Sequence, residues 1–279
     1  MPRSDAIHHR ARLGRGAVAA LAVIGLAAGA AVLLGPAGKG ASAAGGRCGI
    51  GDESASLARP MPHVAARIAS GGTFTIVALG SSSTSGTGAS GPQNTYPSRL
   101  AAALAGRYPG LKVRVVNRGV PGDEAPGMAA RIGRDVLPEK PDLVIWQVGT
   151  NGVINGDDAL HTGEVVRAGV ERIKAAGADV MLMNLQYAPA VLRHPHYRDM
   201  LHELDAVAYA EDVPLFPRFA IMRQWADEGR MPLNVMLGRD RLHMTDVSYE
   251  CLAHQVAATI DGVAPPKVIE ALLPAKTEG

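Results

Sequence analysis

The chain has 279 residues, of which 47% are hydrophobic and 19% are charged, and its formal net charge is +2 at pH 7. The positive charge lies in residues 1–43, which hold five basic side chains and one acidic one, so the rest of the chain carries about −2. The length is sufficient for one well-buried domain, and without a basic surface we predict no nucleic-acid partner.

The first predicted element is a targeting segment in residues 1–43. Arginines precede Ala17 to Leu34, an uncharged and mostly apolar run of 18 residues, and Ala41-Ser42-Ala43 has the small side chains that a signal peptidase requires. We prefer a cleaved signal peptide, with cleavage after Ala43. The run is also just long enough to span a membrane, so an uncleaved signal anchor through residues 17–34 is the alternative. The charge asymmetry predicts a periplasmic or secreted protein in the first case, and one anchored to the inner membrane with its domain outside the cytoplasm in the second.

Beyond this segment, short β-branched and apolar runs alternate with longer stretches in which apolar residues recur every three or four positions. This alternation is typical of an α/β domain with a parallel sheet. We expect an N-terminal arm at 44–72, the folded domain at 73–264 and a C-terminal tail at 265–279. The predicted strands are Phe74–Leu79, Val113–Val116, Leu143–Val148, Val180–Leu185 and Val213–Phe216. The predicted helices are Tyr96–Arg107, Ala125–Leu137, Glu164–Ala176, His196–Ala210 and Ser248–Ile260, and the segments 187–196 and 229–240 are predicted as loops.

Polar and glycine-rich segments follow three consecutive predicted strands. Gly80-Ser81-Ser82 follows the first strand, Asn117 to Asp123 the second, and Gly149-Thr150-Asn151 the third. The carboxyl ends of parallel strands meet at one edge of a sheet, where helix N-termini and loop amides also converge. The sequence therefore predicts a site at this edge that contains a serine, a glycine turn and an asparagine.

An acid and a base stand three residues apart near the end of the chain, at Asp240 and His243. In one turn, this spacing lets the carboxylate reach the imidazole and fix its tautomer, so that the other ring nitrogen can accept a proton. We predict Ser82 as nucleophile, His243 as general base and then general acid, and Asp240 as the group that orients the imidazole. The predicted oxyanion hole consists of the backbone N–H groups of Ser82 and Gly122 and the side-chain amide of Asn151.

Four ordered segments carry a resemblance to a known family. Ala78 to Gly86, Asn117 to Asp123, Gly149 to Asn151, and Asp240 to His243 resemble the successive blocks of the GDSL, or SGNH, hydrolases, over roughly residues 74–262. The resemblance implies a flavodoxin-like three-layer αβα sandwich with a mainly parallel five-stranded sheet. It also implies an esterase, lipase, thioesterase or carbohydrate deacetylase activity without metal or organic cofactor. By this resemblance, Ser82, Gly122, Asn151 and His243 correspond to the family's four named functional residues, and Asp240 completes the triad.

The chain departs from the family pattern at two positions. Ser81 stands where the family usually has aspartate, and Met244 follows the histidine where proline is common. The missing carboxylate at position 81 is next to the nucleophile but is not the triad acid, so a hydroxyl can replace its local hydrogen bonds without abolishing acyl transfer. The adjacent serines leave Ser81 and Ser83 as alternative nucleophiles, and we choose Ser82 from its register relative to the flanking glycines.

Two other groups of residues invite structural predictions. Cys48 and Cys251 are the only cysteines, and an even pair in an exported protein favours a disulfide, with two unpaired thiols as the alternative. His194 and His196 have no acidic or cysteine partner at a metal-binding spacing, so we predict surface or substrate-rim residues and no metal site. Asp157-Asp158 is predicted as a solvated turn or a helix cap.

Together these features predict an exported serine ester hydrolase that acts through an acyl-enzyme on a small-molecule or glycan ester, with a short acyl group on a glycan as one candidate. An O-acyltransferase would use the same triad, and a non-catalytic envelope module that binds glycan or lipid is a second alternative. We expect the loops 187–196 and 229–240 to decide which substrate is accepted.

Overall fold

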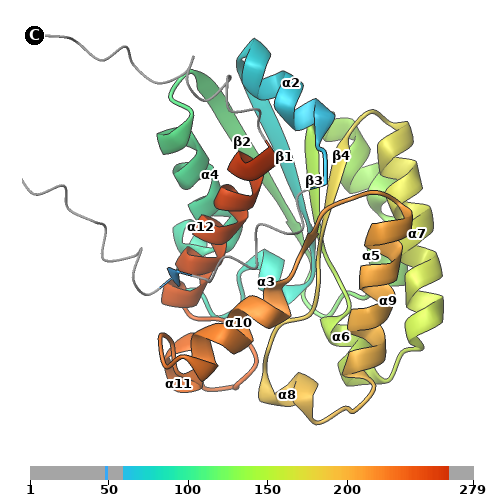
Figure 1. Ribbon diagram of the computed structural model, residues 1–279, viewed down its shortest axis with the longest axis vertical. Coiled ribbons are helices and arrows are strands. Elements are labelled where there is room, and N and C mark those ends of the chain that lie inside the picture. The colour runs from blue at the N-terminus through green and yellow to red at the C-terminus, as the bar shows by residue number, and fades with distance from the viewer. Residues whose placement is uncertain (1–47, 50–58, 264–279) are drawn as a thin grey trace, which may run out of the picture. The chain divides into compact units, whose positions relative to one another are not determined.

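The computed structural model describes residues 48–49 and 59–263 of the chain (Figure 1). The predicted targeting segment at 1–43, part of the predicted arm and the predicted tail at 265–279 lie outside the described residues. Across the ranges that are described, no helix combines the length and the apolar character needed to cross a membrane.

Five parallel strands form one sheet in the order β2-β1-β3-β4-β5. This is the flavodoxin-like order, so the predicted fold class is confirmed. The strands are β1 (Gly72–Gly80), β2 (Leu111–Gly119), β3 (Leu143–Gln147), β4 (Asp179–Met183) and β5 (Leu215–Phe216). All five predicted strands exist. The last is shorter than expected, because Pro214 and Pro217 on either side of it have no N–H to donate to a neighbouring strand.

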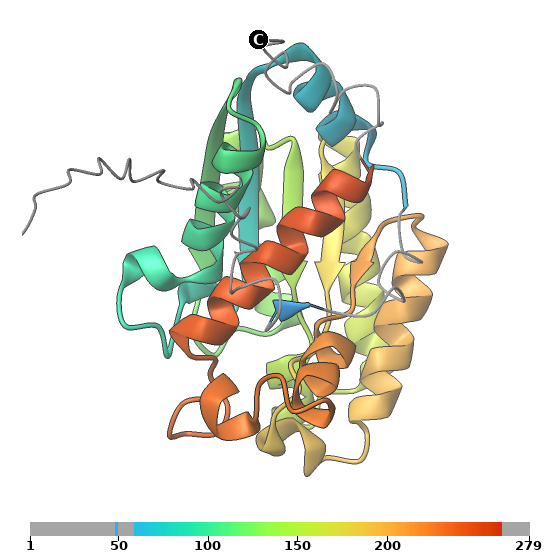
Figure 2. The ribbon, with the colours of Figure 1, turned by 60° about the vertical axis from the view of Figure 1, so that its left-hand side comes forward.

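Helices cover both faces of the sheet, which explains why its inner strands are almost continuously apolar (Figures 1 and 2). On one face lie α2 (Pro62–Ser70), α4 (Tyr96–Arg107) and α12 (Asp246–Val263), and on the other lie α5 (Ala125–Ala130), α7 (Ala159–Ala175) and α9 (Tyr197–Ala210). The core between these layers includes fully buried side chains from β1 and β3, among them Phe74, Leu79 and Trp146. The result is the predicted three-layer sandwich.

Several short helices stand at or near the carboxyl ends of the strands, where the polar segments were predicted. They are α3 (Ser82–Ser85), the 3₁₀ turn η2 (Pro92–Asn94), α6 (Thr150–Asn155), α8 (Pro189–Leu192), α10 (Arg218–Asp227) and α11 (Leu233–Met236). The segments predicted as loops at 187–196 and 229–240 therefore each contain one short helix. Sequence analysis missed α2 and α10 entirely, although Pro62 at the first turn of α2 is a typical helix start.

The predicted helix Ala125–Leu137 is correct only in its first half. After α5 the backbone leaves the α-helical conformation at Arg131 and continues as a π-helical turn, η3 (Ile132–Val136), and a 3₁₀ turn, η4 (Leu137–Glu139). The same arginine donates hydrogen bonds to backbone carbonyls of both β1 and β2. Tertiary contacts at the helix end therefore replace a regular continuation of the helix.

Cys48 and Cys251 form a disulfide with a Cα to Cα distance of 4.9 Å, which confirms the predicted pair. The bridge joins the N-terminal side of the domain to α12 and closes a loop with a sequence separation of 203 residues. Closing a long loop reduces the freedom of the unfolded chain and typically stabilises a protein by about 2–4 kcal/mol.

Candidate active site

Ser82 and His243 meet at the carboxyl edge of the sheet. Ser82 is the first residue of α3, directly after β1, and His243 lies in the connection between α11 and α12. The His243 Nε2 atom is 2.8 Å from Ser82 Oγ, and the Nδ1 atom is 2.6 Å from Asp240 Oδ2. The structure thus brings the three residues predicted as a triad into one hydrogen-bonded line.

The turn that carries Asp240 and His243 is held by its own backbone. The amides of Leu242 and His243 both donate to Asp240 Oδ1 at 3.0 Å, and the amide of Gly238 donates to the His243 carbonyl at 2.8 Å. Partial burial raises the pKa of Asp240, but the hydrogen bonds from the His243 ring and from these two amides outweigh it and hold that pKa below its ordinary value. The carboxylate is therefore charged at neutral pH and can stabilise a protonated imidazole.

The two alternative nucleophiles are turned away from His243. The hydroxyl of Ser81 donates to Gln147 Oε1 at 3.0 Å, and the hydroxyl of Ser83 donates to Gln186 Oε1 at 2.8 Å. Both side chains are buried. Of the three adjacent serines, only Ser82 contacts the imidazole.

The contacts of Gln147 explain why serine can replace the usual aspartate at position 81. Its Oε1 atom accepts from the Ser81 amide, the Ser81 hydroxyl and the Thr84 hydroxyl at 3.0–3.2 Å. A carboxylate at position 81 would face this acceptor instead of donating to it. Gly80 lies so close that a Cβ atom there would stand 2.8 Å from Gln147 Oε1 and 2.2 Å from Thr84 Oγ1, so only glycine fits.

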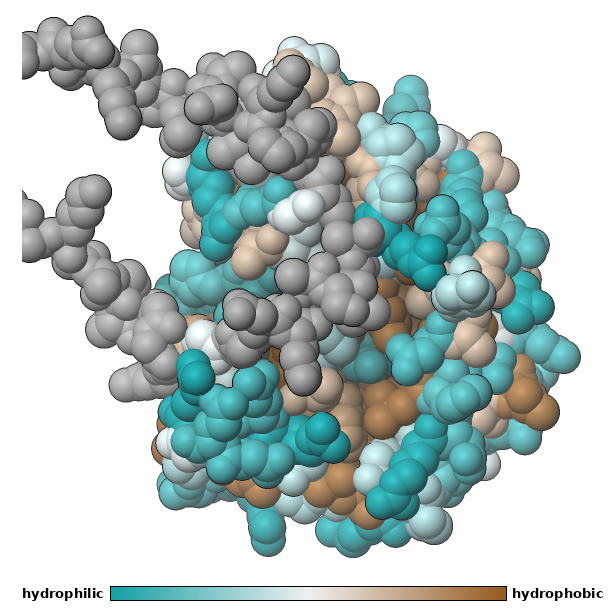
Figure 3. Space-filling model, in the orientation of Figure 1, coloured by the Kyte–Doolittle hydropathy of each residue, from teal (hydrophilic) through white to brown (hydrophobic). Residues whose placement is uncertain are grey.

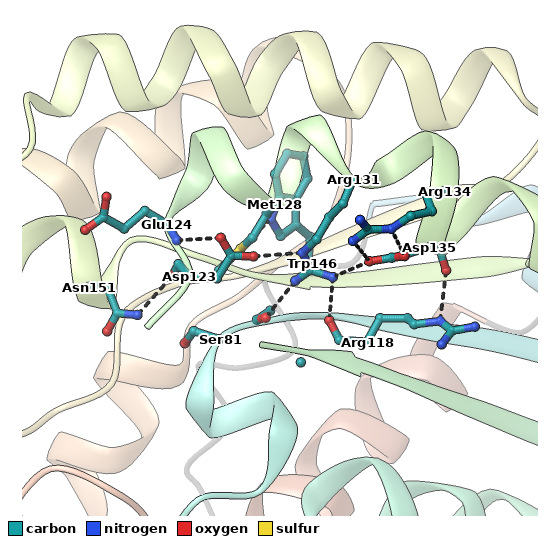
Figure 4. A network of polar contacts seen from close by, with 12 residues as sticks. Ser81, Arg118, Asp123, Glu124, Met128, Arg131, Arg134, Asp135, Trp146 and Asn151 are labelled. Carbon is teal, nitrogen blue, oxygen red and sulfur yellow. Dashed lines mark hydrogen bonds and ion pairs between the residues drawn. The ribbon is translucent and has the colours of Figure 1, made fainter. Parts of the chain in front are cut away.

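The predicted oxyanion residues Gly122 and Asn151 lie in neighbouring segments, the turn after β2 and helix α6, which are hydrogen-bonded to each other. Asn151, in α6, donates one hydrogen of its side-chain amide to the carbonyl of Asp123 at 2.9 Å (Figure 4). Gly122 precedes Asp123 and has a φ of 79°, which glycine adopts without strain. A carboxamide nitrogen carries two hydrogens, so one hydrogen of Asn151 remains available to a ligand.

Arg131 is a residue of this site that sequence analysis missed. Its buried guanidinium donates to the Gly80 carbonyl at 3.0 Å, to the Arg118 carbonyl at 2.8 Å and to Asp123 Oδ2 at 2.7 Å (Figure 4). It therefore ties the ends of β1 and β2 to the glycine turn. No sequence pattern marks an arginine for such contacts, because its partners come from three separate segments.

Gln186, which follows β4 and is fully buried, connects three segments of the site. Its side chain accepts from the Ser83 hydroxyl and donates to the Leu242 carbonyl, and its backbone amide donates to Thr150 Oγ1 at 3.3 Å. Ser83, Thr150 and Leu242 are the neighbours of Ser82, Asn151 and His243 in the sequence. Gln186 thereby fixes the positions of the three predicted blocks relative to one another.

Arg218 in α10 contacts the same segments as Gln186. We call Gln147, Gln186, Arg131 and Arg218 the buried frame of the site. Arg218 is completely buried and donates to Thr150 Oγ1 and to the Asn184 carbonyl, each at 3.1 Å. Burial lowers the pKa of Arg218 to about 10, against the opposing effect of the nearby Tyr96 and Tyr249, so the group is still charged at neutral pH. Its remaining terminal nitrogen has no hydrogen-bond partner among the described residues.

The other predicted polar groups lie outside this constellation. His194 and His196 stack edge to face with ring centroids 5.5 Å apart, and His196 Nε2 is 2.9 Å from the Val153 carbonyl. Asp158 caps α7 by accepting from the His161 amide at 2.8 Å, which confirms the predicted helix cap. Within 48–49 and 59–263, no three histidine, cysteine or acidic side chains are grouped so that they could hold a metal ion.

The sequence is similar to a lipase-like family and to several esterases. A sequence model of the non-GDSL lipase-like family matches residues 47–265. Esterase TesA of Pseudomonas aeruginosa is 31% identical over 111 residues, which are 39% of this chain and 54% of that protein. An acetylxylan esterase of Geobacillus stearothermophilus is 38% identical over 58 residues, which are 21% of this chain and 26% of that protein. The alignments thus span about half or less of these two relatives.

A crystal structure of TesA covers 68% of this chain and 99% of its own, with a TM-score of 0.59 and 25% sequence identity. The sequence resemblance and the predicted architecture are therefore confirmed by independent comparisons.

Proposed function

The chain belongs to the non-GDSL lipase-like family, and we propose that it is a serine ester hydrolase whose catalytic triad is Ser82, His243 and Asp240. The observation that carries this proposal is the line of two hydrogen bonds from Ser82 Oγ through the His243 ring to Asp240. A hydroxyl, an imidazole and a carboxylate in this order form the arrangement that activates a serine for attack on an acyl carbon.

In the proposed reaction, Ser82 Oγ attacks the ester carbonyl while His243 Nε2 accepts the hydroxyl proton. His243 then donates this proton to the leaving alcohol oxygen as the tetrahedral intermediate collapses to an acyl-enzyme. A water molecule attacks the acyl-enzyme while His243 accepts a proton from it. His243 then donates this proton to Ser82 Oγ as the bond to the acyl group breaks, which releases the acid and restores Ser82. Asp240 keeps the Nδ1 proton of His243 in place during both steps.

We propose three donors for the developing oxyanion. Neither the Ser82 N–H nor the Gly122 N–H donates a hydrogen bond within the part of the chain that the structure describes. One hydrogen of the Asn151 amide is also uncommitted, while the other is fixed on Asp123. The loss of one such donor typically costs about 2.7–4 kcal/mol of transition-state stabilisation.

For the substrate, we propose a short acyl group on a glycan, hydrolysed outside the cytoplasm. The short segment that is similar to an acetylxylan esterase supports the glycan ester. The targeting pattern in residues 1–43 and the Cys48–Cys251 disulfide support export, because disulfides persist mainly in oxidising compartments.

The function is tested by the hydrolysis of p-nitrophenyl acetate and the release of acetate from acetylated xylan. We expect Ser82→Ala to abolish both activities. The matched variant Ser83→Ala removes a buried hydroxyl that contacts Gln186 and not His243, and its turnover should stay far above that of Ser82→Ala. Equal rates for the wild type and Ser82→Ala would refute the assignment. Transfer of the acetyl group to an added sugar in place of water would identify an acyltransferase instead.

A further inference from the structure

A cavity of about 670 Å³ adjoins the turn between α11 and α12 on which Asp240 and His243 lie. Its wall combines the start of α8, α11 and the turn that carries Asp240 and His243, and its apolar lining includes Pro189, Leu233 and Leu237. This volume is within the range of small-molecule sites. The lining comes mostly from 187–196 and 229–240, the two segments that sequence analysis expected to decide substrate choice.

Two arginines give this cavity a positive charge. Arg239 and Arg241 both line it, on either side of Asp240 in the sequence. Asp240 is engaged with His243, and no ion pair joins Arg239 or Arg241 to an acidic residue anywhere in the described ranges. Because the chain beyond residue 43 carries about −2, these two charges are a local feature and not part of a generally basic surface.

The backbone of Arg241 gives a separate reason to look for a role of its side chain. Its φ is 56°, in the left-handed region where glycine is favoured over a long side chain. The turn itself is held by hydrogen bonds that do not involve the guanidinium, such as the one from the Arg241 amide to the Gly238 carbonyl at 2.9 Å. Glycine would therefore satisfy the turn, so the guanidinium of Arg241 is not needed to hold it.

We propose that this cavity binds the alcohol portion of the ester and that Arg239 and Arg241 recognise a carboxylate or phosphate group on it. The inference rests on the proposed function. A guanidinium binds either anion with paired hydrogen bonds, and both arginines are exposed at the cavity, where an anion can reach them. The substrate class is then an acyl ester of an acidic alcohol, such as an acidic glycan.

The proton transfer indicates which part of the ester enters the cavity. His243 must donate its proton to the leaving oxygen, so the alcohol portion has to depart on the His243 side of Ser82. The cavity is bounded by residues of that same turn, from Gly238 to Thr245. The acyl group, on the far side of the carbonyl carbon, would not reach the two arginines in this arrangement.

Three acetate esters of similar shape test the inference: 4-acetoxybenzoate, 4-acetoxyphenyl phosphate and the neutral methyl 4-acetoxybenzoate. The quantity to follow is the ratio of kcat/KM for each anionic ester to that for the neutral ester. We expect Arg239→Gln and Arg241→Gly each to lower this ratio about tenfold at low salt. Glycine at position 241 suits the positive φ, so a deformed turn would not account for the loss. The larger loss, with benzoate or with phosphate, identifies the preferred anion.

The control is Arg172→Gln, which removes an exposed arginine from α7 on the other face of the sheet and should leave the ratio unchanged. For the wild type, raising the salt concentration from 20 to 500 mM should also lower the ratio, because salt screens exposed charges. A ratio that does not change in either cavity variant would overturn the inference. So would a charge preference seen only with mono-4-nitrophenyl succinate, whose anion is on the acyl side.

The failure of this inference can be distinguished from the failure of the proposed function. If the wild type hydrolyses the neutral and anionic esters alike through Ser82, only the anion site is wrong. If it hydrolyses none of the esters and Ser82 does not react with a fluorophosphonate, the proposed function is wrong.

Discussion

The two sides of the site differ in how they are built. Beneath Ser82, the frame is buried and densely bonded: Gln147, Gln186 and Arg218 are at most 1% exposed, and Arg131 is 7% exposed. On the cavity side, α8, α11 and the turn after α11 are short elements. α11 and the turn have exposed residues, and the side chain of Asp240 itself is 50% exposed. Figure 3 shows apolar and polar residues mixed over one face of the molecule.

The difference suits two separate tasks: the buried side holds the catalytic groups in position, and the cavity side selects the substrate. A catalytic group has to stay within a fraction of an ångström of its position, and a buried hydrogen-bond network provides that rigidity. Substrate choice needs only a surface of suitable shape and charge, which loops can provide at little cost to stability. Changes in the buried frame should therefore lower kcat or stability, whereas changes in the cavity wall should act mainly on substrate binding.

The largest effect is expected where an exposed residue belongs to the catalytic line. Asp240→Asn should lower kcat about 10⁴-fold, because an amide favours the wrong tautomer of the imidazole. Asp246→Asn is the matched control, since Asp246 accepts from Ser90 and Asn94 instead of from His243, and we expect it to keep kcat within about threefold. Kinetics with p-nitrophenyl acetate measure both variants, and full activity of Asp240→Asn would remove the role assigned to Asp240.

The next largest effect is a loss of kcat when a residue of the buried frame is changed. Gln186→Met keeps the shape of the side chain but removes its bonds to Ser83 and Leu242, and we expect a loss of kcat of about 10- to 100-fold. KM should change by less than threefold, since Gln186 does not line the cavity. Gln255→Met, which removes a bond to the Cys48 carbonyl, is the control. A loss expressed mainly in KM would contradict the proposed separation of the two tasks.

The frame can also be tested through stability, with two nearby arginines. Arg131→Met leaves Asp123, whose side chain is 13% exposed, without its ion-pair partner and removes a buried guanidinium, so it should lower the free energy of unfolding by about 3 kcal/mol. Arg134→Met removes a guanidinium whose side chain is 76% exposed and should lower it by at most about 1 kcal/mol. Chemical denaturation gives both values. Similar losses in the two variants would mean that burial does not distinguish them.

The smallest expected effect is on the pH dependence of stability in acid. Hydrogen bonds from Arg134 and, to a lesser extent, from Arg131 hold the pKa of Asp135 down to about 2, although partial burial opposes them. A carboxyl whose pKa is lowered by folding stabilises the protein above its ordinary pKa, and this contribution is lost as the pH falls towards the folded value. Asp135→Asn should therefore flatten the fall in stability between about pH 4 and pH 2. An unchanged slope in acid denaturation would contradict the assignment.

Sequence analysis anticipated the features that depend on local spacing. The apolar runs gave the strands, the order of the four blocks gave the fold and the site, and the three-residue spacing of Asp240 and His243 brings acid and base together within one turn. It could not anticipate Arg131, Gln186 or Arg218, because their partners lie in segments that only the folded sheet brings together. For the same reason the end of the predicted helix at 125–137, where Arg131 reaches across to two strands, was wrong.

His243 is proposed to activate Ser82, and the site and rate of labelling by a fluorophosphonate measure this activation. We expect the wild type to be modified at a single residue, which peptide sequencing identifies as Ser82, and we expect labelling to slow by at least about 10³-fold in His243→Ala. Modification of another serine would show that Ser82 is not the nucleophile, and labelling of His243→Ala at the rate of the wild type would show that His243 does not activate it.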